Sequence, residues 1–239
     1  MRFGIIGHPV QGSMSPRLFG AAYDGRYPYD LLDFDSFDDA WQCFLHGYDG
    51  INVTAPFKQD AFRAVTSLDD NARRSGAVNL VVKRPGGILE GHNTDVDGVL
   101  YALSGQPFSD VLVVGAGGAA RAAVVAALRL GARVSVVNRT FAKAQELSAI
   151  DPAVTAVPTE EMPILRPSLI IYTLPGRAPV PAGLPLSGAA VLEAEYKAPV
   201  LAGHPRYISG RQWLLGQAVA GYSLFTGEMP SAQKMLRVL

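Results

Sequence analysis

A glycine-rich segment in the middle of the chain has the residue types and the spacing that bind a dinucleotide. Gly115-Ala116-Gly117-Gly118-Ala119-Ala120 follows an apolar run at residues 111–114 and opens an apolar helical stretch that reaches Leu130. The first glycine permits a tight turn, and the second lets backbone amides approach a pyrophosphate at the positive end of the helix. A second apolar run at residues 134–137 completes a strand–turn–helix–strand unit. In this context the spacing predicts a dinucleotide site.

The residues after that second run indicate which dinucleotide binds. Asn138-Arg139-Thr140 occupies the position where a unit that prefers NAD usually places an acid for the ribose hydroxyls. No Asp or Glu occurs between residues 132 and 145. A guanidinium binds a 2′-phosphate in a forked geometry, and a carboxylate would repel it. We therefore predict NADP as the cofactor. The alternative is that Arg139 only caps a surface loop.

Several polar side chains in the first hundred residues stand where strand-like runs end, which is where open α/β sheets bind ligands. Ser13 and Ser15 stand at the start of a predicted helix and could hold a carboxylate. Taken alone, an N-cap role for either serine would be favoured. Lys58 falls on the first turn of a later helix, where its charge opposes the helix dipole. Asp95 follows another strand and could both cap the helix that begins at Val96 and act in a site.

These residues need alternating strands and helices to position them. Before the glycine-rich segment we predict strands at 2–6, 29–34 and 51–53, helices at 15–23, 38–46 and 56–65, and a hairpin of 78–82 with 88–90. After it, strands are expected at 169–172, 190–192 and 206–208, and a helix at 211–225. This alternation is typical of mostly parallel sheets, and the hairpin would add an antiparallel edge. The sequence predicts an α/β fold of two domains with a cleft between them.

Composition narrows the class of protein. The 239 residues carry a formal net charge of zero and no block of like charges, which argues against a nucleic-acid or membrane partner. The single cysteine, Cys43, excludes an intramolecular disulfide and fits a reducing compartment. Arginines interrupt the longest apolar stretch, so no transmembrane helix is expected, and no signal peptide is recognised. We expect a cytoplasmic protein, monomeric or homodimeric, that binds a small molecule and holds no metal.

Motifs that cover nearly the whole chain resemble those of the shikimate dehydrogenase family. The segment Gly50-Ile51-Asn52-Val53-Thr54-Ala55-Pro56-Phe57-Lys58 is similar to the lysine motif of that family. The glycine turn and the Asn138-Arg139-Thr140 segment match it as well. The other matches occur in the family order and are Ser13-Met14-Ser15-Pro16, Gly76-Ala77-Val78-Asn79, Asn93-Thr94-Asp95-Val96-Asp97-Gly98, Gly210-Arg211-Gln212-Trp213-Leu214-Leu215-Gly216-Gln217-Ala218 and Phe225-Thr226-Gly227.

The resemblance implies the reversible, NADPH-dependent reduction of 3-dehydroshikimate to shikimate. It implies a catalytic pair of Lys58 and Asp95. Hydride that arrives at a ketone generates an alkoxide, which needs an adjacent cation or acid, and an ammonium supplies both. The substrate-binding residues implied by the family pattern are Ser13 and Ser15 for the carboxylate, and Thr54, Asn79 and Gln217 for the ring hydroxyls, with Tyr196 nearby.

The resemblance also implies how the chain is divided. Residues 1–97 would form a mostly parallel substrate-binding domain, and residues 98–210 a doubly wound, Rossmann-type domain that binds NADP. Residues 211–239 would form a helical segment that packs back on the substrate domain. Gln217 shares a helical stripe with apolar residues, so its amide is expected to point inward and to need partners.

The chain departs from the family pattern at a few positions. Residues 172–177 read Tyr-Thr-Leu-Pro-Gly-Arg in place of the usual Asn-Ala-Thr-Ser, in a shortened loop, and Glu193 replaces an expected Asp. Two alternatives therefore stay open. The chain could be a related dehydrogenase that acts on quinate, or a catalytically weak paralogue that binds NADP and senses a ligand.

Overall fold

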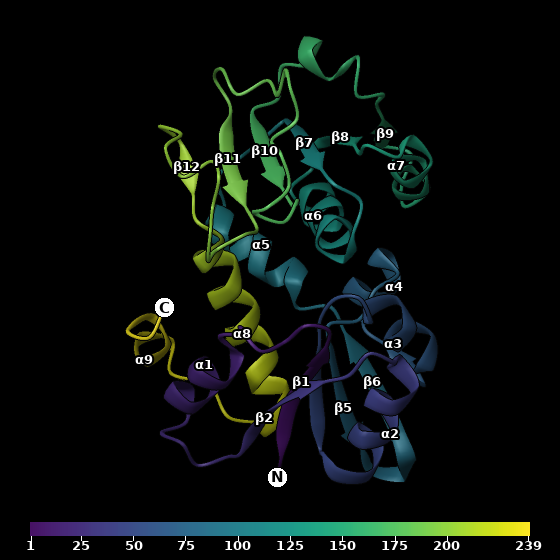
Figure 1. The fold of residues 1–239 in the computed structure, drawn as a ribbon, viewed down its shortest axis with the longest axis vertical. Helices are drawn as coiled ribbons and strands as arrows, with labels where there is room; N and C mark the ends of the chain where they lie inside the picture. The colour runs from purple at the N-terminus through teal and green to yellow at the C-terminus, as the bar shows by residue number, and fades with distance from the viewer. The chain divides into compact units, whose positions relative to one another are not determined.

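The computed structural model describes residues 1–239, and the chain divides into two compact units. The first unit consists of Met1–Gly98 and Leu215–Leu239, and the second of Val99–Leu214. Helices α5 (Asp95–Leu103) and α8 (Gly210–Thr226) each begin in one unit and end in the other (Figure 1). The functional domain boundaries at residues 97 and 210 stay predictions.

The first unit is built on a six-stranded sheet with the order β2-β1-β3-β5-β6-β4. The strand β5 runs antiparallel to both of its neighbours, β3 and β6, and the other pairings are parallel. The strands are β1 (Phe3–Gly7), β2 (Tyr29–Asp33), β3 (Gly50–Val53), β4 (Ser67–Leu68), β5 (Leu80–Arg84) and β6 (Ile88–His92). The predicted antiparallel edge is therefore wrong, because the two-residue strand β4 pairs outside β6 and places the hairpin within the sheet.

Helices cover both faces of this sheet (Figure 1). On one face, Phe3 of β1 stacks on Phe225 of α8 with a centroid distance of 4.8 Å, and Phe19 of α1 (Ser15–Ala22) meets both rings edge-on. On the other face, Ile6 packs with buried side chains of α2 (Phe37–Gly47), α3 (Lys58–Ala64) and α4 (Asp70–Ser75). Because successive side chains of β1 point to opposite faces of the sheet, Phe3 packs on one layer of helices and Ile6 on the other.

The second unit contains a six-stranded parallel sheet with the order β12-β11-β10-β7-β8-β9. Its central strand β7 pairs with β8 on one side and with β10 on the other, so the strand order reverses at β7. The strands are β7 (Asp110–Val114), β8 (Arg133–Val137), β9 (Val154–Ala156), β10 (Leu169–Tyr172), β11 (Ala190–Glu193) and β12 (Tyr207–Ile208). This is the doubly wound arrangement that the sequence predicts.

The helices of the second unit lie between these strands in the sequence. Helix α6 (Gly118–Arg129) packs on β7 and β8, and its run of small side chains from Ala122 to Ala127 is fully buried. Helix α7 (Phe141–Ser148) follows β8. No helix separates β10 from β11. Instead the segment between them covers the sheet with partly buried leucines such as Leu174 and Leu184.

The structure corrects some predicted elements. Pro56 is not part of the helix after β3: a cis peptide joins Ala55 to Pro56, Phe57 takes the N-cap position, and Lys58 is the first helical residue. The sequence did not predict α4, α7, β4, β9 or the C-terminal helix α9 (Ala232–Leu236). The turn between β5 and β6 is as predicted, a short 3-10 turn at Pro85–Gly87 in which Gly86 and Gly87 have φ of 78°.

Candidate active site

Lys58 and Asp95 form an ion pair at the carboxyl ends of β3 and β6. The Lys58 Nζ lies 2.5 Å from the Asp95 Oδ2, and the two side chains are 15% and 7% exposed. Lys58 is the first residue of α3 and Asp95 the first residue of α5, so each side chain leaves the start of a helix. The helix dipole stabilises a carboxylate at a helix N-terminus and destabilises an ammonium there. The Asp95 carboxylate offsets this unfavourable interaction of the Lys58 ammonium. The structure therefore brings together the two residues for which the sequence predicts catalysis.

An amide network borders this pair. Asn79, which directly precedes β5, accepts a hydrogen bond from the Thr94 backbone N–H at 2.8 Å and donates to Thr94 Oγ1 at 3.1 Å. Its Nδ2 also donates to the Gln217 Oε1 at 3.3 Å. Gln217 comes from α8, so residues 138 positions apart in the sequence share one polar site. One partner of the Gln217 amide is thus Asn79, another predicted site residue.

Two glycines allow the elements around the network to approach closely. A Cβ at Gly221 of α8 would lie 2.7 Å from Leu80 Cδ1 and 3.3 Å from Thr94 Oγ1. A Cβ at Gly7, which ends β1, would lie 2.3 Å from Thr54 Cγ2. Thr54 is held by its backbone, whose N–H donates to the Ile6 carbonyl. Its hydroxyl makes no hydrogen bond within the chain, and it is available to a ligand.

Ser13 and Ser15 are adjacent hydroxyls at the start of α1. The Ser13 Oγ lies 3.1 Å from the Ser15 Oγ and accepts the Ser15 backbone N–H at 3.2 Å. The N-cap position itself belongs to Met14, which has no side-chain cap bond. Neither serine is therefore the N-cap, although Ser13 satisfies one helix-terminal N–H. Both side chains remain partly exposed and can turn to a bound anion.

Tyr29 and Asn52 connect the serines to the amide network. The Tyr29 hydroxyl donates to the Asn52 Oδ1 at 2.7 Å, and the Asn52 Nδ2 donates to the Asn79 carbonyl at 3.3 Å. Burial raises the pKa of Tyr29 well above 10, and a hydrogen bond with Ser15 opposes part of that rise. The phenol therefore stays a neutral donor. No sequence pattern singles out Tyr29, and Asn52 stands out only as part of a motif. The two side chains come together because β2 and β3 belong to one sheet.

A cavity of about 820 Å³ lies at the carboxyl edge of the sheet in the second unit. This volume is within the roughly 300–1,000 Å³ that ligand pockets occupy. Most of its wall comes from three places: the glycine turn at Gly115, Ala116 and Gly117, the segment Asn138, Arg139 and Thr140, and the loop after β10, including Thr173, Leu174, Pro175 and Ala178. The predicted cofactor residues thus line one pocket, apart from Gly118 and Ala119, which begin α6 beside it.

The glycine turn has the geometry of an anion cradle. Gly115 has a φ of 113°, and a Cβ there would lie 2.4 Å from Thr173 Oγ1. Gly117 caps α6 without a side-chain bond, and a Cβ on it would meet open space. The first amides of α6, from Gly118 onward, therefore have no side-chain partner and face a place where a pyrophosphate can approach.

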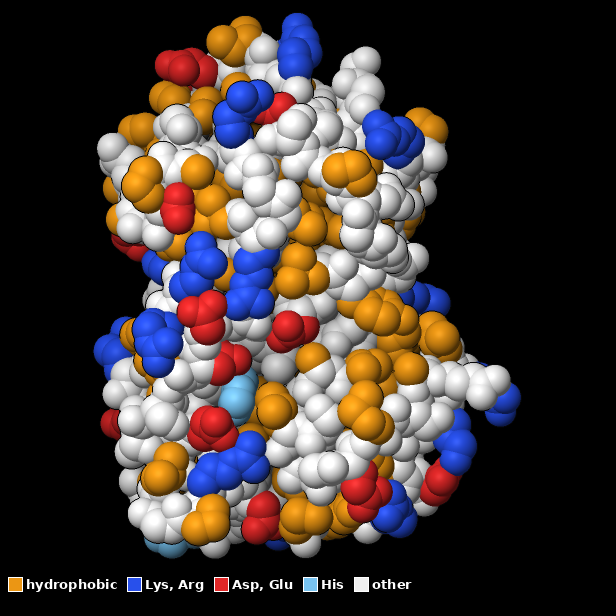
Figure 2. Space-filling model, turned by 180° about the vertical axis from the view of Figure 1, so that it is seen from behind, with side chains coloured by type: hydrophobic (Ala, Val, Ile, Leu, Met, Phe, Trp, Pro, Cys, Tyr) orange, Lys and Arg blue, Asp and Glu red, His pale blue; other side chains and the backbone are white.

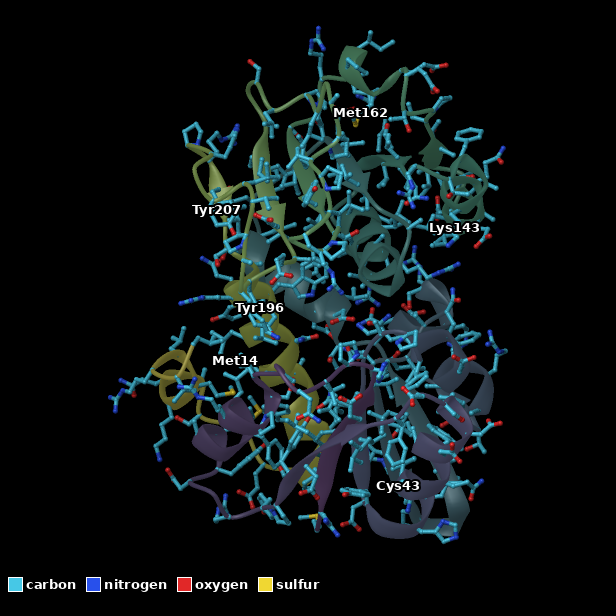
Figure 3. All side chains as sticks on the ribbon, viewed as in Figure 1. Met14, Cys43, Lys143, Met162, Tyr196 and Tyr207 are labelled. Carbon is cyan, nitrogen blue, oxygen red and sulfur yellow. The ribbon has the colours of Figure 1, made fainter.

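A pair of cations stands at the β8 end of the same pocket. Arg139 and Lys143 both line it, and neither side chain makes a hydrogen bond or ion pair within the chain. Lys143 lies on α7, where Figure 3 labels it, and the sequence analysis missed it. The Asn138 Nδ2 donates to the Thr140 carbonyl at 2.9 Å and so shapes the turn that presents Arg139. Arg139 is thus not a loop cap, and two unpaired cations here fit a phosphate.

The remaining predicted residue, Tyr196, belongs to the second unit. It follows β11 and is partly buried, and Figure 3 labels it. The Lys197 Nζ lies 5.7 Å from the centre of its ring. Its role toward a substrate stays a prediction. Glu193, the departure noted in the sequence, is fully buried at the end of β11 and accepts the backbone N–H groups of Val200 and Leu201 at 2.7 and 3.0 Å.

On the face shown in Figure 2, lysines and arginines alternate with acidic side chains and form no broad area of one charge. No helix has both the length and the apolar character needed to cross a membrane. A second cavity, of about 340 Å³, lies at the opposite ends of β7 and β8, but its Asp110 and Arg133 pair with each other at 2.7 Å.

Comparison with known families matches both units. Residues 5–81 match the shikimate dehydrogenase substrate binding domain, and residues 91–169 match the C-terminal domain of alanine dehydrogenase/PNT. A shikimate dehydrogenase (NADP(+)) of Caulobacter vibrioides is 36% identical over an alignment of 270 residues, which covers 99% of this chain and 93% of the relative.

Solved structures agree with these matches. The shikimate 5-dehydrogenase of Thermus thermophilus, in complex with NADP(H) and shikimate, is 28% identical over the whole of both chains, with a TM-score of 0.85. A quinate dehydrogenase of Corynebacterium glutamicum in complex with NAD covers 100% of this chain and 98% of its own, with a TM-score of 0.86. At 24% identity, that second likeness concerns the fold alone.

Proposed function

Because this chain belongs to the shikimate dehydrogenase family, we propose that it catalyses the reversible, NADP-dependent conversion of shikimate to 3-dehydroshikimate. The observation that carries the proposal is the Lys58–Asp95 ion pair, 2.5 Å long and bordered by the Asn79–Gln217 amide pair. A mostly buried cation next to amide and hydroxyl groups suits a substrate that carries several hydroxyls and gains charge on one oxygen.

Lys58 is the group that handles the proton. In the direction of ketone reduction, its ammonium donates a hydrogen bond and then a proton to the oxygen that becomes the hydroxyl. In the direction of oxidation, Lys58 holds the same proton. Asp95 keeps the lysine side chain in place through the 2.5 Å contact and neutralises its charge when the site has no substrate. Low exposure strengthens both interactions, since little water competes for them.

The remaining residues of the first unit bind and orient the substrate. Ser13 and Ser15 offer two hydroxyls to the carboxylate, with the neutral Tyr29 phenol behind Ser15. The free hydroxyl of Thr54 and the amides of Asn79 and Gln217 accept and donate at the ring hydroxyls. A site that hydrogen-bonds each hydroxyl discriminates strongly against analogues that lack one, because its own polar groups would be left unpaired.

The cofactor pocket of the second unit fits NADP. Gly115 and Gly117 give the backbone room for a pyrophosphate, and the uncapped start of α6 supplies amide donors. Arg139 and Lys143 supply two unpaired cations for the 2′-phosphate, and no acid lines the pocket. When bound, the nicotinamide cofactor supplies or accepts the hydride. A role for Tyr196 in binding the substrate stays a prediction. A cytoplasmic location and a monomeric or homodimeric state stay predictions.

A panel of substrates and cofactors tests this proposal. Shikimate, quinate and a blank are each incubated with NADP and with NAD. Initial rates of cofactor reduction are followed by absorbance over a range of substrate concentrations, and calorimetry measures binding. We expect rapid reduction of NADP with shikimate, and little with quinate or with NAD. A higher kcat/KM for quinate would assign the chain to quinate instead. Binding of NADP and shikimate without turnover would identify a ligand-binding paralogue.

A further inference from the structure

Two loops meet at the carboxyl edge of the second sheet on the side of β10 and β11. Residues 173–178 follow β10, and residues 194–198 follow β11, its parallel neighbour. The strands remain paired at this edge, because the Ala194 N–H donates to the Tyr172 carbonyl at 2.8 Å. The first of these loops forms one wall of the cofactor pocket through Thr173, Leu174, Pro175 and Ala178. Neither loop is part of a helix or strand, so something else must fix their positions.

Glu195 is the side chain that joins the two loops. Its Oε1 accepts the backbone N–H groups of Lys197 at 2.8 Å and Ala198 at 3.4 Å, within its own loop. Gly176, from the other loop, lies against the same side chain: a Cβ on Gly176 would lie 3.1 Å from Glu195 Cγ, and its backbone N–H lowers the pKa of Glu195. Burial raises the pKa of the Glu195 carboxyl, but these three donors and the Lys197 charge outweigh burial, and the pKa is lowered. The carboxylate is therefore a charged acceptor for backbone N–H groups of its own loop, and it lies against Gly176 of the other loop.

Gly176 makes this close contact possible. A Cβ on Gly176 would lie 2.5 Å from the Ala198 carbonyl oxygen and 3.1 Å from Glu195 Cγ. A carbonyl oxygen of the backbone cannot shift as a flexible side chain can. Any larger residue at position 176 would separate the loops and break the contact with Glu195.

The strand order assigns the two halves of the dinucleotide to opposite sides of β7. A dinucleotide lies across the point where the strand order reverses, which here is β7 between β8 and β10. Arg139 and Lys143 follow β8, so the phosphate-bearing adenosine half belongs to the β8 side. The nicotinamide half must then lie on the β10 side, against the loop at 173–178.

We propose that Glu195 is a positioning residue that holds the 173–178 wall in the form that receives the nicotinamide half of the cofactor. The inference rests on the proposed function, because it takes NADP as the ligand. Glu195 lines neither the glycine turn nor the cation pair, so it has no effect on how the adenosine phosphate is held. Its loss leaves the adenosine half bound and the nicotinamide half poorly placed.

Limited proteolysis of the protein without ligands tests directly whether Glu195 holds the 173–178 loop in place. Arg177 is exposed and lies in the 173–178 loop, next to Gly176. Trypsin cleavage after Arg177, mapped by mass spectrometry, reports how often that loop opens. We expect faster cleavage in Glu195→Ala than in wild type. Glu195→Gln, which keeps an acceptor oxygen, should restore most of the protection. Glu160→Ala, which removes an exposed glutamate of the same unit, serves as the matched control and should be cleaved as wild type is.

Binding measurements then distinguish an effect on the nicotinamide half of the cofactor from an effect on the adenosine half. Calorimetry compares NADP with adenosine 2′,5′-bisphosphate, which carries only the adenosine half. Because only the closed fraction of loops is competent, Glu195→Ala should weaken NADP binding by about threefold or more. The affinity for adenosine 2′,5′-bisphosphate should not change. Gly176→Ala provides a second route to the same result if Glu195→Ala does not fold, as judged by a thermal melt.

The possible outcomes test the role of Glu195 separately from the proposed function. Unchanged cleavage at Arg177, or equal losses for NADP and for adenosine 2′,5′-bisphosphate, would overturn the role of Glu195. A wild-type protein that binds NADP but does not oxidise shikimate would overturn the proposed function, and the proteolysis and binding comparisons would still decide the role of Glu195.

Discussion

The Lys58 Nζ and the Asp95 Oδ2 lie 2.5 Å apart, although α3 and α5 contribute them from separate parts of the sequence. At 15% and 7% exposure, neither charge is well solvated, so each depends on the other. The pair also lies next to the Asn79–Gln217 contact, so a bound hydroxyl would find a cation and several hydrogen-bonding partners.

Lys58→Ala tests whether this cation acts in the reaction. We expect kcat to fall by roughly 10²–10⁴-fold, the usual contribution of a positioned general acid or base, and the affinity for shikimate to change little. The charge is needed mainly where the alkoxide develops, which is why kcat should respond more than KM. Steady-state kinetics and calorimetry measure the two effects. Arg63→Ala, which removes an exposed cation from the same helix, is the control, and a Lys58→Ala variant with near-normal kcat would remove Lys58 from the mechanism.

Ser13→Ala combined with Ser15→Ala tests the carboxylate site. Binding of the carboxylate is shared by the ground state and the transition state, so KM for shikimate should rise and kcat should change little. Hydrogen bonds to a charged group contribute about 1.5–3 kcal/mol each, so the rise should be at least roughly tenfold. KM for NADP should stay the same. An unchanged KM for shikimate would limit the two serines to the local contacts at the start of α1.

Lys143→Ala tests the cation that the sequence analysis missed. Lys143 is exposed and can contribute only a modest, screened attraction to the 2′-phosphate, so KM for NADP should rise by up to about fivefold. The rise should shrink as salt is added, because salt screens an exposed charge. KM for NAD should not change. Arg133→Ala is the control: this exposed cation begins β8, whereas Arg139 follows its end. An equal effect of Lys143→Ala on NADP and NAD would rule out phosphate binding.

Glu195→Gln tests a pH-dependent contribution to stability. The pKa of Glu195 is lowered in the folded protein from its ordinary 4.5, so its charge stabilises the fold at pH values above that value. As the pH falls through the lower folded pKa, the carboxylate is protonated and this stabilisation disappears. Thermal melts should therefore show a higher Tm for wild type than for Glu195→Gln at neutral pH, and similar Tm values in strong acid. A Tm difference that stays constant with pH would show that the charge does not hold the loops.

The sequence predicted the elements that have a clear periodic pattern. The apolar runs that became β7, β8 and β10 are mostly buried, and glycine follows β7, so both strand type and position could be predicted. The two-residue strand β4 has no such pattern, and its pairing with β6 depends on tertiary structure alone. This is why the antiparallel strand was expected at an edge. Pro56 suggested a helix start because proline favours the first turn of a helix. The cis peptide bond before Pro56 cannot be recognised from sequence.

The same contrast applies to the site. Lys58, Asp95 and Arg139 stand near strand ends within recognisable motifs, so their roles could be predicted. Tyr29 and Lys143 carry no local signal: a tyrosine in a strand is usually packing, and an exposed lysine on a helix is usually solvated. Their importance comes from the parallel strands, which bring distant parts of the sequence to one edge. Glu195 was not among the predicted site residues. Its contact with the other loop becomes visible only in the structure, where Gly176 lies against its side chain.

The ratio of kcat/KM for NADP to that for NAD, at saturating shikimate, tests the central claim most directly, because it requires both oxidation of shikimate and selection of the phosphate. We expect a ratio well above one in wild type. A forked, charge-assisted contact contributes about 1.5–3 kcal/mol, so Arg139→Ala should lower the ratio roughly tenfold to a hundredfold. The loss should fall on NADP alone, since the ribose gains no acidic partner. No turnover of shikimate, a wild-type ratio below one, or a ratio that Arg139→Ala leaves unchanged would contradict the account.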